Sequence, residues 1–275
     1  PNGQGLAALI ALAILRHTNL ADLAPDSLAA THLQIEAMKL GFADVHRYVA
    51  DPEHLDVDPR DLLGDAYAAE RAALIDPARA GAPTYGVPRR GGTVYLTCAD
   101  AEGRMVSFIQ SNYYGFGSGV VVPGTGISLQ NRGAGFTLQS GHPNQVGPRK
   151  RPFHTIIPAF LTEQGKPRMA FGVMGGPMQP QGHVQMVVRT ALWGRNPQAA
   201  ADAPRWRVVE GRTVAVEDAM PAAVLAGLEA MGHEITRTPP EASFSFGGAQ
   251  LIWRQEDGSY VAGSDPRKDG LALGY

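Results

Sequence analysis

The first quarter of the chain carries apolar residues at the spacing of helices. Residues 5–16 are almost entirely apolar, which predicts a buried helix. In residues 27–48 the apolar positions recur at helical spacing, and Ser27 suits the N-cap of that helix. A third helix is expected over residues 58–75, because an aspartate followed by Pro59 is typical of a helix start. The pattern therefore predicts a helical N-terminal region.

The pattern changes after a linker that is rich in Gly and Pro. This linker covers residues 80–92 and ends in two arginines and two glycines, directly before Thr93. Gly and Pro mark turns and loops, and exposed loops tolerate cleavage of the chain. We therefore expect a processing linker between a helical region, residues 1–92, and a second region, residues 93–275, the two together forming one structural domain.

From residue 93 onward the sequence has the β-branched residues and the alternation of strands. Two hairpins are predicted, one from residues 93–99 and 104–110 and one from residues 155–161 and 168–173, because turn-forming residues separate each pair. Further strands are expected over residues 120–122, 127–130, 205–209, 213–216, 233–237, 249–254 and 260–262, and helices over residues 180–193, 197–203 and 220–231. Hairpin connections in place of alternating βαβ units predict a layered α+β fold with mainly antiparallel sheets.

The composition argues against several classes of protein. With 275 residues, of which 44% are hydrophobic and 18% charged, the chain can bury a sizeable core. Its net charge of −2 argues against a nucleic-acid surface. The longest apolar run, residues 6–15, is much shorter than the roughly 20 residues that span a bilayer. The single cysteine, Cys98, permits no intrachain disulfide and is expected to lie buried in its strand.

No cofactor or metal motif is recognised in the sequence. The loop at residues 115–119 has neither the glycine spacing nor the following helix of a dinucleotide site. The eight histidines are scattered, and we identify no histidine–carboxylate pair at ligand spacing on one helix. We therefore expect no cofactor and no metal, with His32 and His46 on a polar helix face or at the edge of the core and His233 at the start of a strand.

Thr93 combines features of an N-terminal nucleophile. Gly92 can adopt backbone conformations that bring the Gly92–Thr93 peptide bond toward the threonine hydroxyl. After cleavage of that bond, Thr93 would carry an α-amine with a pKa of about 7.7–8.0 beside its own hydroxyl. A threonine hydroxyl activated by its own N-terminal amine is an established nucleophile. Taken alone, however, these residues are better explained as a glycine hinge before an ordinary strand.

Further motifs occur in order along the chain. They are Gly92-Thr93, Ser111, the glycine-rich loop 115–119, residues 129–131, residues 147–152, Gly175-Gly176, residues 263–267 and residues 274–275. Together they resemble the γ-glutamyltranspeptidase family of N-terminal nucleophile (Ntn) hydrolases over essentially the whole chain. The resemblance implies an αββα sandwich without a cofactor. It also implies that residues 1–92 are the end of a large subunit, whose upstream segment lies outside this sequence, and that residues 93–275 are a small subunit.

The resemblance implies a role for each central residue. Thr93 would first attack the carbonyl of Gly92, which cleaves the chain, and would then attack a substrate amide with its own amine as the base. Ser111 would orient the nucleophile. The N–H groups of Gly175 and Gly176 would form the oxyanion hole. The alternative interpretations are an ordinary loop serine and a tight turn between a strand and a helix.

The substrate-binding positions depart from the family pattern. Paired aspartates usually follow the Gln-Asn motif, and one of them binds the substrate α-amino group, whereas residues 132–136 contain no carboxylate. Paired serines of the family are replaced by His154 and Thr155, and Tyr113 stands where an asparagine usually helps to hold the α-carboxylate. The predicted substrate-binding residues are Asn112, Tyr113, Arg132, Gly135, His154 and Thr155. Arg132 and His154 are expected to meet an acyl group that ends in a carboxylate and lacks an α-amine, as in glutaryl-type acylases, and a plain loop histidine is the alternative for His154.

The sequence thus predicts a self-processing N-terminal-threonine amidohydrolase or acyltransferase. Its substrate would be a small-molecule amide or peptide whose γ-glutamyl-like or glutaryl-like acyl group is transferred to Thr93. No nucleic-acid or membrane partner is expected. The alternative is an unprocessed or non-catalytic fragment that keeps only the scaffold. The compartment (periplasmic, secreted or cytoplasmic) and the oligomeric state stay open.

Overall fold

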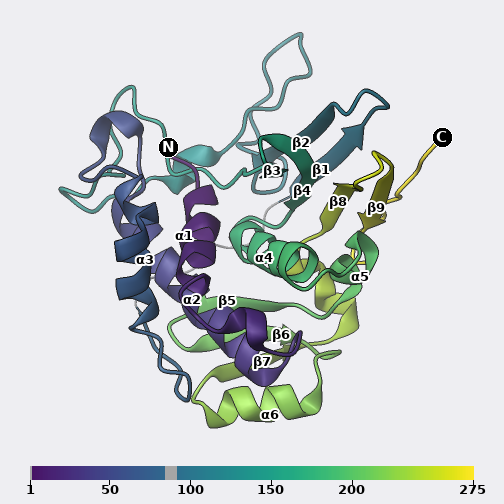
Figure 1. The fold of residues 1–275 in the computed structure, drawn as a ribbon. Coiled ribbons are helices and arrows are strands. Elements are labelled where there is room, and N and C mark those ends of the chain that lie inside the picture. The colour runs from purple at the N-terminus through teal and green to yellow at the C-terminus, as the bar shows by residue number, and fades with distance from the viewer. Residues whose placement is uncertain (1, 84–91) are drawn as a thin grey trace.

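The computed structural model describes residues 2–83 and 92–275 (Figure 1). Of the predicted linker, the arginine pair and Gly91 lie outside the described residues. The described chain forms N-terminal helices, a pair of stacked sheets, and a third sheet with its own helix.

The N-terminal region is helical, as the apolar spacing predicts. It contains α1 (Gly5–Leu15), α2 (Leu28–Tyr48) and α3 (Asp65–Ala72). The third predicted helix is too long at both ends, since α3 begins only after Gly64, whose extended backbone interrupts the helix. The residues before it form a short 3₁₀ turn, Asp61–Leu63.

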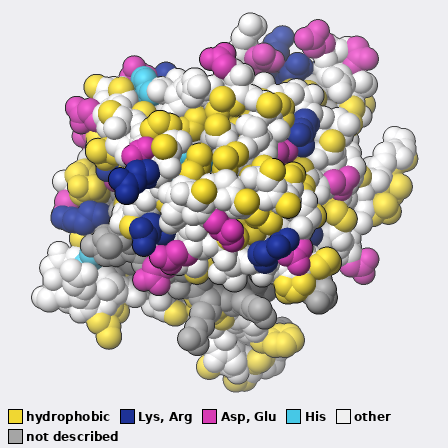
Figure 2. All heavy atoms as spheres, turned by 90° about the horizontal axis from the view of Figure 1, so that it is seen from below, with side chains coloured by type: hydrophobic (Ala, Val, Ile, Leu, Met, Phe, Trp, Pro, Cys, Tyr) yellow, Lys and Arg dark blue, Asp and Glu magenta, His cyan; other side chains and the backbone are white. Residues whose placement is uncertain are grey.

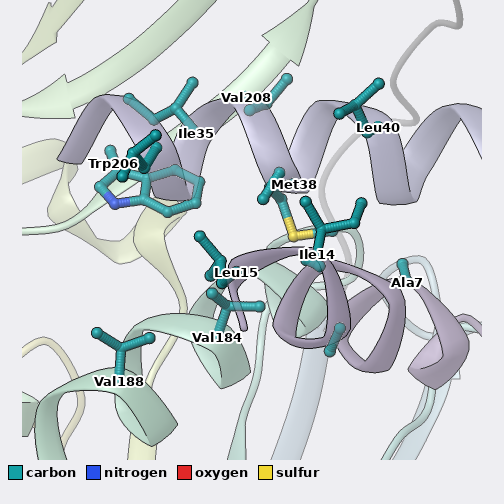
Figure 3. Close-up of a cluster of buried hydrophobic side chains, with 14 of the residues drawn as sticks. Ala7, Ile14, Leu15, Ile35, Met38, Leu40, Val184, Val188, Trp206 and Val208 are labelled. Carbon is teal, nitrogen blue, oxygen red and sulfur yellow. The ribbon is translucent and has the colours of Figure 1, made fainter. Parts of the chain in front are cut away.

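α1 and α2 pack at close range and build the larger hydrophobic core. Gly41 of α2 permits this approach, because a Cβ there would lie 2.7 Å from the carbonyl oxygen of Ala7. The same core includes side chains of α4 (Met178–Val187), of the π-helical turn after it and of β5 (Trp206–Glu210). Figure 3 labels Ala7, Ile14, Leu15, Ile35, Met38, Leu40, Val184, Val188, Trp206 and Val208 of this core. Residues from both sides of the predicted processing bond therefore share one core.

Two antiparallel sheets lie against each other at the upper right of Figure 1. One is the predicted first hairpin, and the other has the strand order β3-β4-β8-β9. Their bounds are Gly92–Ala99 for β1, Met105–Tyr113 for β2, Ala159–Glu163 for β3, Lys166–Val173 for β4, Ala249–Arg254 for β8 and Tyr260–Ser264 for β9. Tyr95 of β1 lies on Gly172 of β4, where a Cβ would come within 2.5 Å of the tyrosine ring. Glycine at this position therefore lets the two sheets pack closely.

Helices cover one side of this pair of sheets. α4 packs on β4, and α5 (Pro197–Asp202) packs on β8 and β9. The outer face of the β1–β2 hairpin carries Val94, Leu96, Val106 and Phe108, which are 46–59% exposed, and no element of the described chain covers them. Helices on stacked antiparallel sheets confirm the expected α+β sandwich.

A third sheet lies at the bottom of the molecule in Figure 1. β5 pairs with β6 (Thr213–Glu217) in antiparallel orientation, whereas β6 pairs with β7 (Glu234–Thr238) in parallel. α6 (Ala222–Ala230) connects the parallel pair, so this βαβ unit is an exception to the predicted hairpin connections. Figure 2 shows the molecule from below, and on this face positive and negative side chains are interspersed with hydrophobic ones.

Two short strands predicted over residues 120–122 and 127–130 do not form. Val121 and Ser128 make only an isolated bridge. Two glycines with positive φ lie between them and turn the chain tightly, which leaves too few residues for a ladder.

Two further predictions need correction. The strand expected over residues 155–161 begins only after Pro158, because proline has no N–H to donate to a neighbouring strand. Cys98 is exposed and not buried, since it lies on the outer face of the hairpin, opposite to the side on which Tyr95 is buried.

None of the described helices combines the length and the apolarity that crossing a membrane requires.

A buried ion network fixes the end of the chain. Arg205 and Asp265 form an ion pair in which both residues are at most 1% exposed. Arg267 forms one ion pair with Asp265, at 3.1 Å, and another with Glu217, at 2.6 Å. Burial raises the pKa of Asp265, but the two arginines outweigh it and hold the pKa below the usual value. The motif at residues 263–267 therefore anchors β9 to the third sheet.

Candidate active site

The β1–β2 hairpin places Ser111 next to Thr93. The ladder is regular up to Val94 and shifts between Val94 and Gly92, so that Ser111 and Asn112 both stand opposite Thr93. Two residues opposite one is the pattern of a β-bulge, which redirects side chains and is frequent beside active sites. The predicted nucleophile and its predicted hydroxyl partner are therefore neighbours across two strands.

Ser111 is held by groups on both sides of it. Its Oγ accepts a hydrogen bond of 2.8 Å from the N–H of Tyr113, and its carbonyl accepts one of 3.4 Å from Arg132. Tyr113 has a φ of 80°, a conformation that is unfavourable for a residue with a Cβ. Its hydroxyl donates to that of Tyr114 at 3.0 Å. These contacts compensate for a strained backbone directly after the bulge.

Asn112 is tied to the loop that follows the hairpin. Its carbonyl accepts a hydrogen bond of 3.2 Å from the N–H of Asn131. The Asn131 side chain accepts from the Tyr114 N–H and donates to the Gly117 carbonyl, both at 3.0 Å. Asn131 therefore organises the backbone around the predicted substrate-binding residues.

Arg132 is a buried cation beside Ser111. It is 6% exposed, donates to Thr155 Oγ1 at 3.1 Å and lies over the Tyr113 ring, 5.2 Å from the centroid. Burial lowers the pKa of its guanidinium. None of the ion pairs in the described part of the chain involves Arg132. A buried guanidinium without a carboxylate is costly, and an anionic ligand would relieve that cost.

His154 lies close enough to Arg132 to be affected by its charge. Burial and the Arg132 charge lower the pKa of His154 to about 4, so the ring is neutral at pH 7. Its Nδ1 accepts a hydrogen bond of 3.1 Å from the N–H of Ile156, which places the proton on Nε2. His154 can therefore offer a neutral donor to a ligand, but it adds no positive charge.

Three of the predicted substrate-binding residues share one cavity. Tyr113, Gly135 and Thr155 line a space of about 160 Å³, together with Pro177. At Gly135 a Cβ would lie 2.5 Å from the Phe153 carbonyl oxygen, so no side chain fits there. The described residues that line this cavity include neither Asp nor Glu. The cavity therefore lacks a partner for a substrate ammonium group.

The Gly175–Gly176 turn leads directly into α4. The φ angles are 114° at Gly175 and 59° at Gly176, both in the region that favours glycine. Within the described residues, neither of the two N–H groups has a hydrogen-bond acceptor. The buried side chain of Gln4 donates to the carbonyls of Gly176 at 2.9 Å and of Thr155 at 2.7 Å. Gln4 thus joins the turn to the cavity, a role that its sequence position gives no sign of.

Thr93 faces a second, larger cavity. This space of about 550 Å³ is lined by Thr93 and Tyr95 on one side, and by Met174, which directly precedes Gly175, on another. Lys268 also lines it, with its Nζ over the ring of Phe244 and donating to that residue's carbonyl at 3.1 Å. Burial lowers the pKa of Lys268 to about 8. The sequence motifs give no reason to expect this lysine on the cavity that Thr93 lines.

One expectation about histidines is wrong. His32 and Glu36 stand one turn apart on α2, which is ligand spacing on one helix, and His233 joins them. The three buried side chains have their ligand atoms within 4.8 Å of one another. The pair is visible in the sequence, but the third member is distant along the chain.

Comparisons with known proteins identify the family of the chain. The γ-glutamyltranspeptidase family profile matches residues 1–275. The chain is 38% identical over 282 residues to the oxamate amidohydrolase proenzyme of Klebsiella pneumoniae, covering 100% of this chain and 52% of that protein. It is 36% identical over 281 residues to the glutathione hydrolase-like YwrD proenzyme of Bacillus subtilis, covering 100% and 53%.

A solved structure is similar over the whole fold. The crystal structure of cephalosporin acylase from Bacillus halodurans superposes with a TM-score of 0.92 at 48% identity, covering 100% of this chain and 50% of that one. The chain thus spans about half the length of the relatives that it matches. A match over every residue, with relatives well above 30% identity, leads to one conclusion: the chain belongs to the γ-glutamyltranspeptidase family.

Proposed function

We propose that this chain carries the catalytic centre of a self-processing amidohydrolase or acyltransferase with Thr93 as its nucleophile. The observation that supports this most is the position of Thr93, opposite Ser111 at a bulge and on one cavity with Met174 before the Gly175–Gly176 turn. Relatives that are named proenzymes, an amidohydrolase among them, add support. The division into residues 1–92 and 93–275 is part of this proposal.

Self-cleavage begins with the attack of Thr93 Oγ on the carbonyl carbon of Gly92. The acyl group moves from the Thr93 nitrogen to its oxygen, and water hydrolyses the resulting ester. The products are a carboxylate on Gly92 and a free α-amine on Thr93, which then serves as the base for the neighbouring hydroxyl. Ser111 holds the hydroxyl in orientation from the opposite strand.

Turnover repeats the attack on a substrate amide. The Thr93 amine accepts the hydroxyl proton while Oγ bonds to the amide carbon, and the oxyanion is held by the N–H groups of Gly175 and Gly176. The proton passes to the leaving amine, and an acyl ester on Thr93 remains. Water, or an amine acceptor in a transferase reaction, then releases the acyl group.

Replacing Gly175 with alanine is expected to lower kcat on the order of 10²–10³, as the loss of an oxyanion-hole donor typically does. The added Cβ would lie 3.1 Å from Gly247 Cα and 3.2 Å from Met178 Cβ, so the turn must move. Gly194→Ala is the matched control, because Gly194 also has a positive φ, of 64°, but has open space around it. Steady-state kinetics on folded, cleaved protein should show a lower kcat for Gly175→Ala than for Gly194→Ala. An unchanged kcat in Gly175→Ala would contradict the role of the Gly175 N–H as an oxyanion-hole donor.

The acyl group that fits best ends in a carboxylate and has no α-amine. Arg132 offers a buried guanidinium without an acidic partner in the described chain, and the cavity lined by Tyr113 and Thr155 has no Asp or Glu for an ammonium. Asp269 lines the other cavity, which Thr93 faces. Oxamate, which the Klebsiella relative is named for, is an amide with a carboxylate and no amine. Glutaryl amides have the same two features on a longer chain. Arg132 would bind the carboxylate, with His154 as a neutral donor beside it.

A comparison of three substrates tests this proposal. We expect kcat/KM for a glutaryl anilide or for oxamate to exceed that for the γ-glutamyl anilide by roughly tenfold or more, since an ammonium buried without a carboxylate loses hydration. N-terminal sequencing of the purified protein should first show a fragment that starts at Thr93. A preference for the γ-glutamyl anilide would refute the acyl specificity. An intact, inert chain would instead favour the scaffold-only alternative.

We also propose that a large-subunit-like segment covers the outer face of the β1–β2 hairpin. Its alternate side chains, Val94, Leu96, Val106 and Phe108, form an exposed apolar stripe. Relatives about twice as long as this chain have the residues for such a layer. A helix on this face would complete the αββα order, since contiguous apolar surface of this kind marks an interface.

A further inference from the structure

A buried polar cluster lies between α2, the segment after α3 and the start of β7. We call it the α2 cluster, and its members are His32, Glu36, Lys39 and His233, each at most 4% exposed. Lys39 Nζ donates to Glu36 Oε1 at 2.9 Å and contacts His233 Nδ1 at 3.4 Å. His32 Nδ1 and His233 Nε2 lie 2.8 Å apart. Burial on this scale requires that each polar group be paired.

The α2 cluster holds the backbone of the segment that enters the linker. Glu36 Oε2 accepts from the N–H of Gly81 at 3.0 Å, and Lys39 donates to the Gly81 carbonyl at 2.9 Å. His32 Nε2 is 2.8 Å from the carbonyl of Asp76. At Gly81 a Cβ would lie 2.8 Å from Glu36 Oε2, so a larger residue would push the carboxylate away. A buried ion pair is therefore bound to both backbone groups of one glycine.

The hydrogen bonds of the α2 cluster are complete without a metal. His32 donates from Nε2 to a carbonyl, so its Nδ1 accepts from His233 Nε2, and His233 Nδ1 accepts from Lys39. Burial, with the charge of Lys39, lowers the pKa of His233 to about 3, so this ring is neutral. Lys39 and Glu36 then balance each other's charge. A divalent cation among His32, Glu36 and His233 would add two uncompensated charges next to Lys39, which is unfavourable in a buried site.

The held segment runs toward the Gly175–Gly176 turn. Pro83, Lys39 and Pro177 line the same small cavity, of about 20 Å³, and Pro177 directly follows Gly176. The α2 cluster also spans the proposed cleavage bond, because His233 belongs to residues 93–275 and the other three members precede it. The cluster therefore connects the entrance of the linker to the half of the chain that contains the nucleophile.

We propose that the α2 cluster is a positioning device for maturation: by fixing Gly81 it anchors the chain ahead of the proposed cleavage bond and so favours the attack of Thr93 Oγ on the Gly92 carbonyl. It takes no part in amide turnover after cleavage. Packing alone would be served as well by apolar side chains, whereas hydrogen bonds to both backbone groups of Gly81 fix a direction. This inference rests on the proposed self-cleavage at Gly92–Thr93.

The test follows the cleavage of freshly synthesised precursor over time. Lys39→Met keeps the length of the side chain but donates no hydrogen bond, and Gly81→Ala displaces Glu36 from the other side. We expect cleavage to slow roughly 10- to 100-fold in both variants, the effect typical of a small misplacement of reacting groups. Once cleaved, both variants should show the kcat/KM of the wild type. Asp44→Asn is the control, since it breaks a different buried ion pair of α2, with Arg71 at 2.8 Å.

Each outcome bears on the proposal. Slow cleavage in Lys39→Met and Gly81→Ala, with normal cleavage in an equally destabilised Asp44→Asn, supports it. Equal cleavage rates for the wild type and Lys39→Met overturn it. Stoichiometric zinc in the native protein that disappears in His32→Ala also overturns it, because the cluster is then a metal centre. If the wild type itself stays uncut, the proposed self-cleavage has failed and this inference falls with it.

Discussion

A Thr93→Ala variant is expected to remain a single chain and to hydrolyse no amide. Without the hydroxyl, neither the Gly92 carbonyl nor a substrate can be attacked, and loss of a nucleophile typically costs on the order of 10⁴–10⁶ in rate. Thr93 is only half-buried and borders a cavity, so alanine should not disturb the core. Intact-mass spectrometry over time and an anilide hydrolysis assay measure the two losses.

Two further variants make the Thr93 experiment specific. Thr93→Ser keeps both the hydroxyl and the α-amine and should still cleave and hydrolyse, although more slowly. Thr162→Ala removes an exposed strand threonine outside both cavities and should behave as the wild type. If Thr93→Ala still separated into residues 1–92 and 93–275, another group would have to perform the cleavage.

The sequence predicted those parts of the fold that short-range patterns determine. The first hairpin, α1 and α2 follow from alternation and helical spacing over adjacent residues, and the bounds of β1, α1 and α2 agree closely with the predictions. β2 is the exception, since it continues through Ser111 to Tyr113, beyond the predicted end at residue 110. The start of α3 was misplaced because Pro59 is a permissive signal, whereas the extended Gly64 decides where the helix can begin. The segments around Val121 and Ser128 lie opposite each other but make only an isolated bridge, which shows that β-branched residues do not by themselves extend a ladder.

The candidate site likewise contains residues that short sequence motifs predict and residues that only the folded chain brings into place. Thr93, Ser111 and the glycine turn stand in recognisable motifs, but the bulge that aligns the first two depends on the register of a whole hairpin. Gln4 and Lys268 carry no local signal, since Gln4 contacts Thr155, which is distant along the chain, and Lys268 lines a cavity that also includes the distant Thr93. The α2 cluster was missed because His233 becomes a neighbour of His32 only after the third sheet has formed.

Replacing Arg132 should lower activity without lowering the stability of the fold. It and Arg189 are similarly buried, at 6% and 3% exposure, but Arg189 has Asp26 as an ion-pair partner at 3.2 Å. Removal of a buried charge that has no partner relieves a desolvation cost, whereas removal of one side of an ion pair leaves the other side uncompensated. Residues that bind ligands are often kept at the expense of stability in this way.

Arg132→Met is therefore expected to hydrolyse carboxylate-bearing acyl anilides with a kcat/KM lower on the order of 10²–10³, the loss typical of removing one side of a buried charge pair. Its urea midpoint should stay equal to that of the wild type or rise, because methionine fills the same space without a charge. For a substrate whose carboxylate is methylated, kcat/KM should fall little in Arg132→Met, because the ester carries no charge to pair with the guanidinium. Arg189→Met is the matched control and should show the reverse, a lower urea midpoint with normal kcat/KM. An Arg132→Met enzyme that loses activity equally on the charged and the methylated substrate would show that Arg132 supports the hairpin and does not bind the carboxylate.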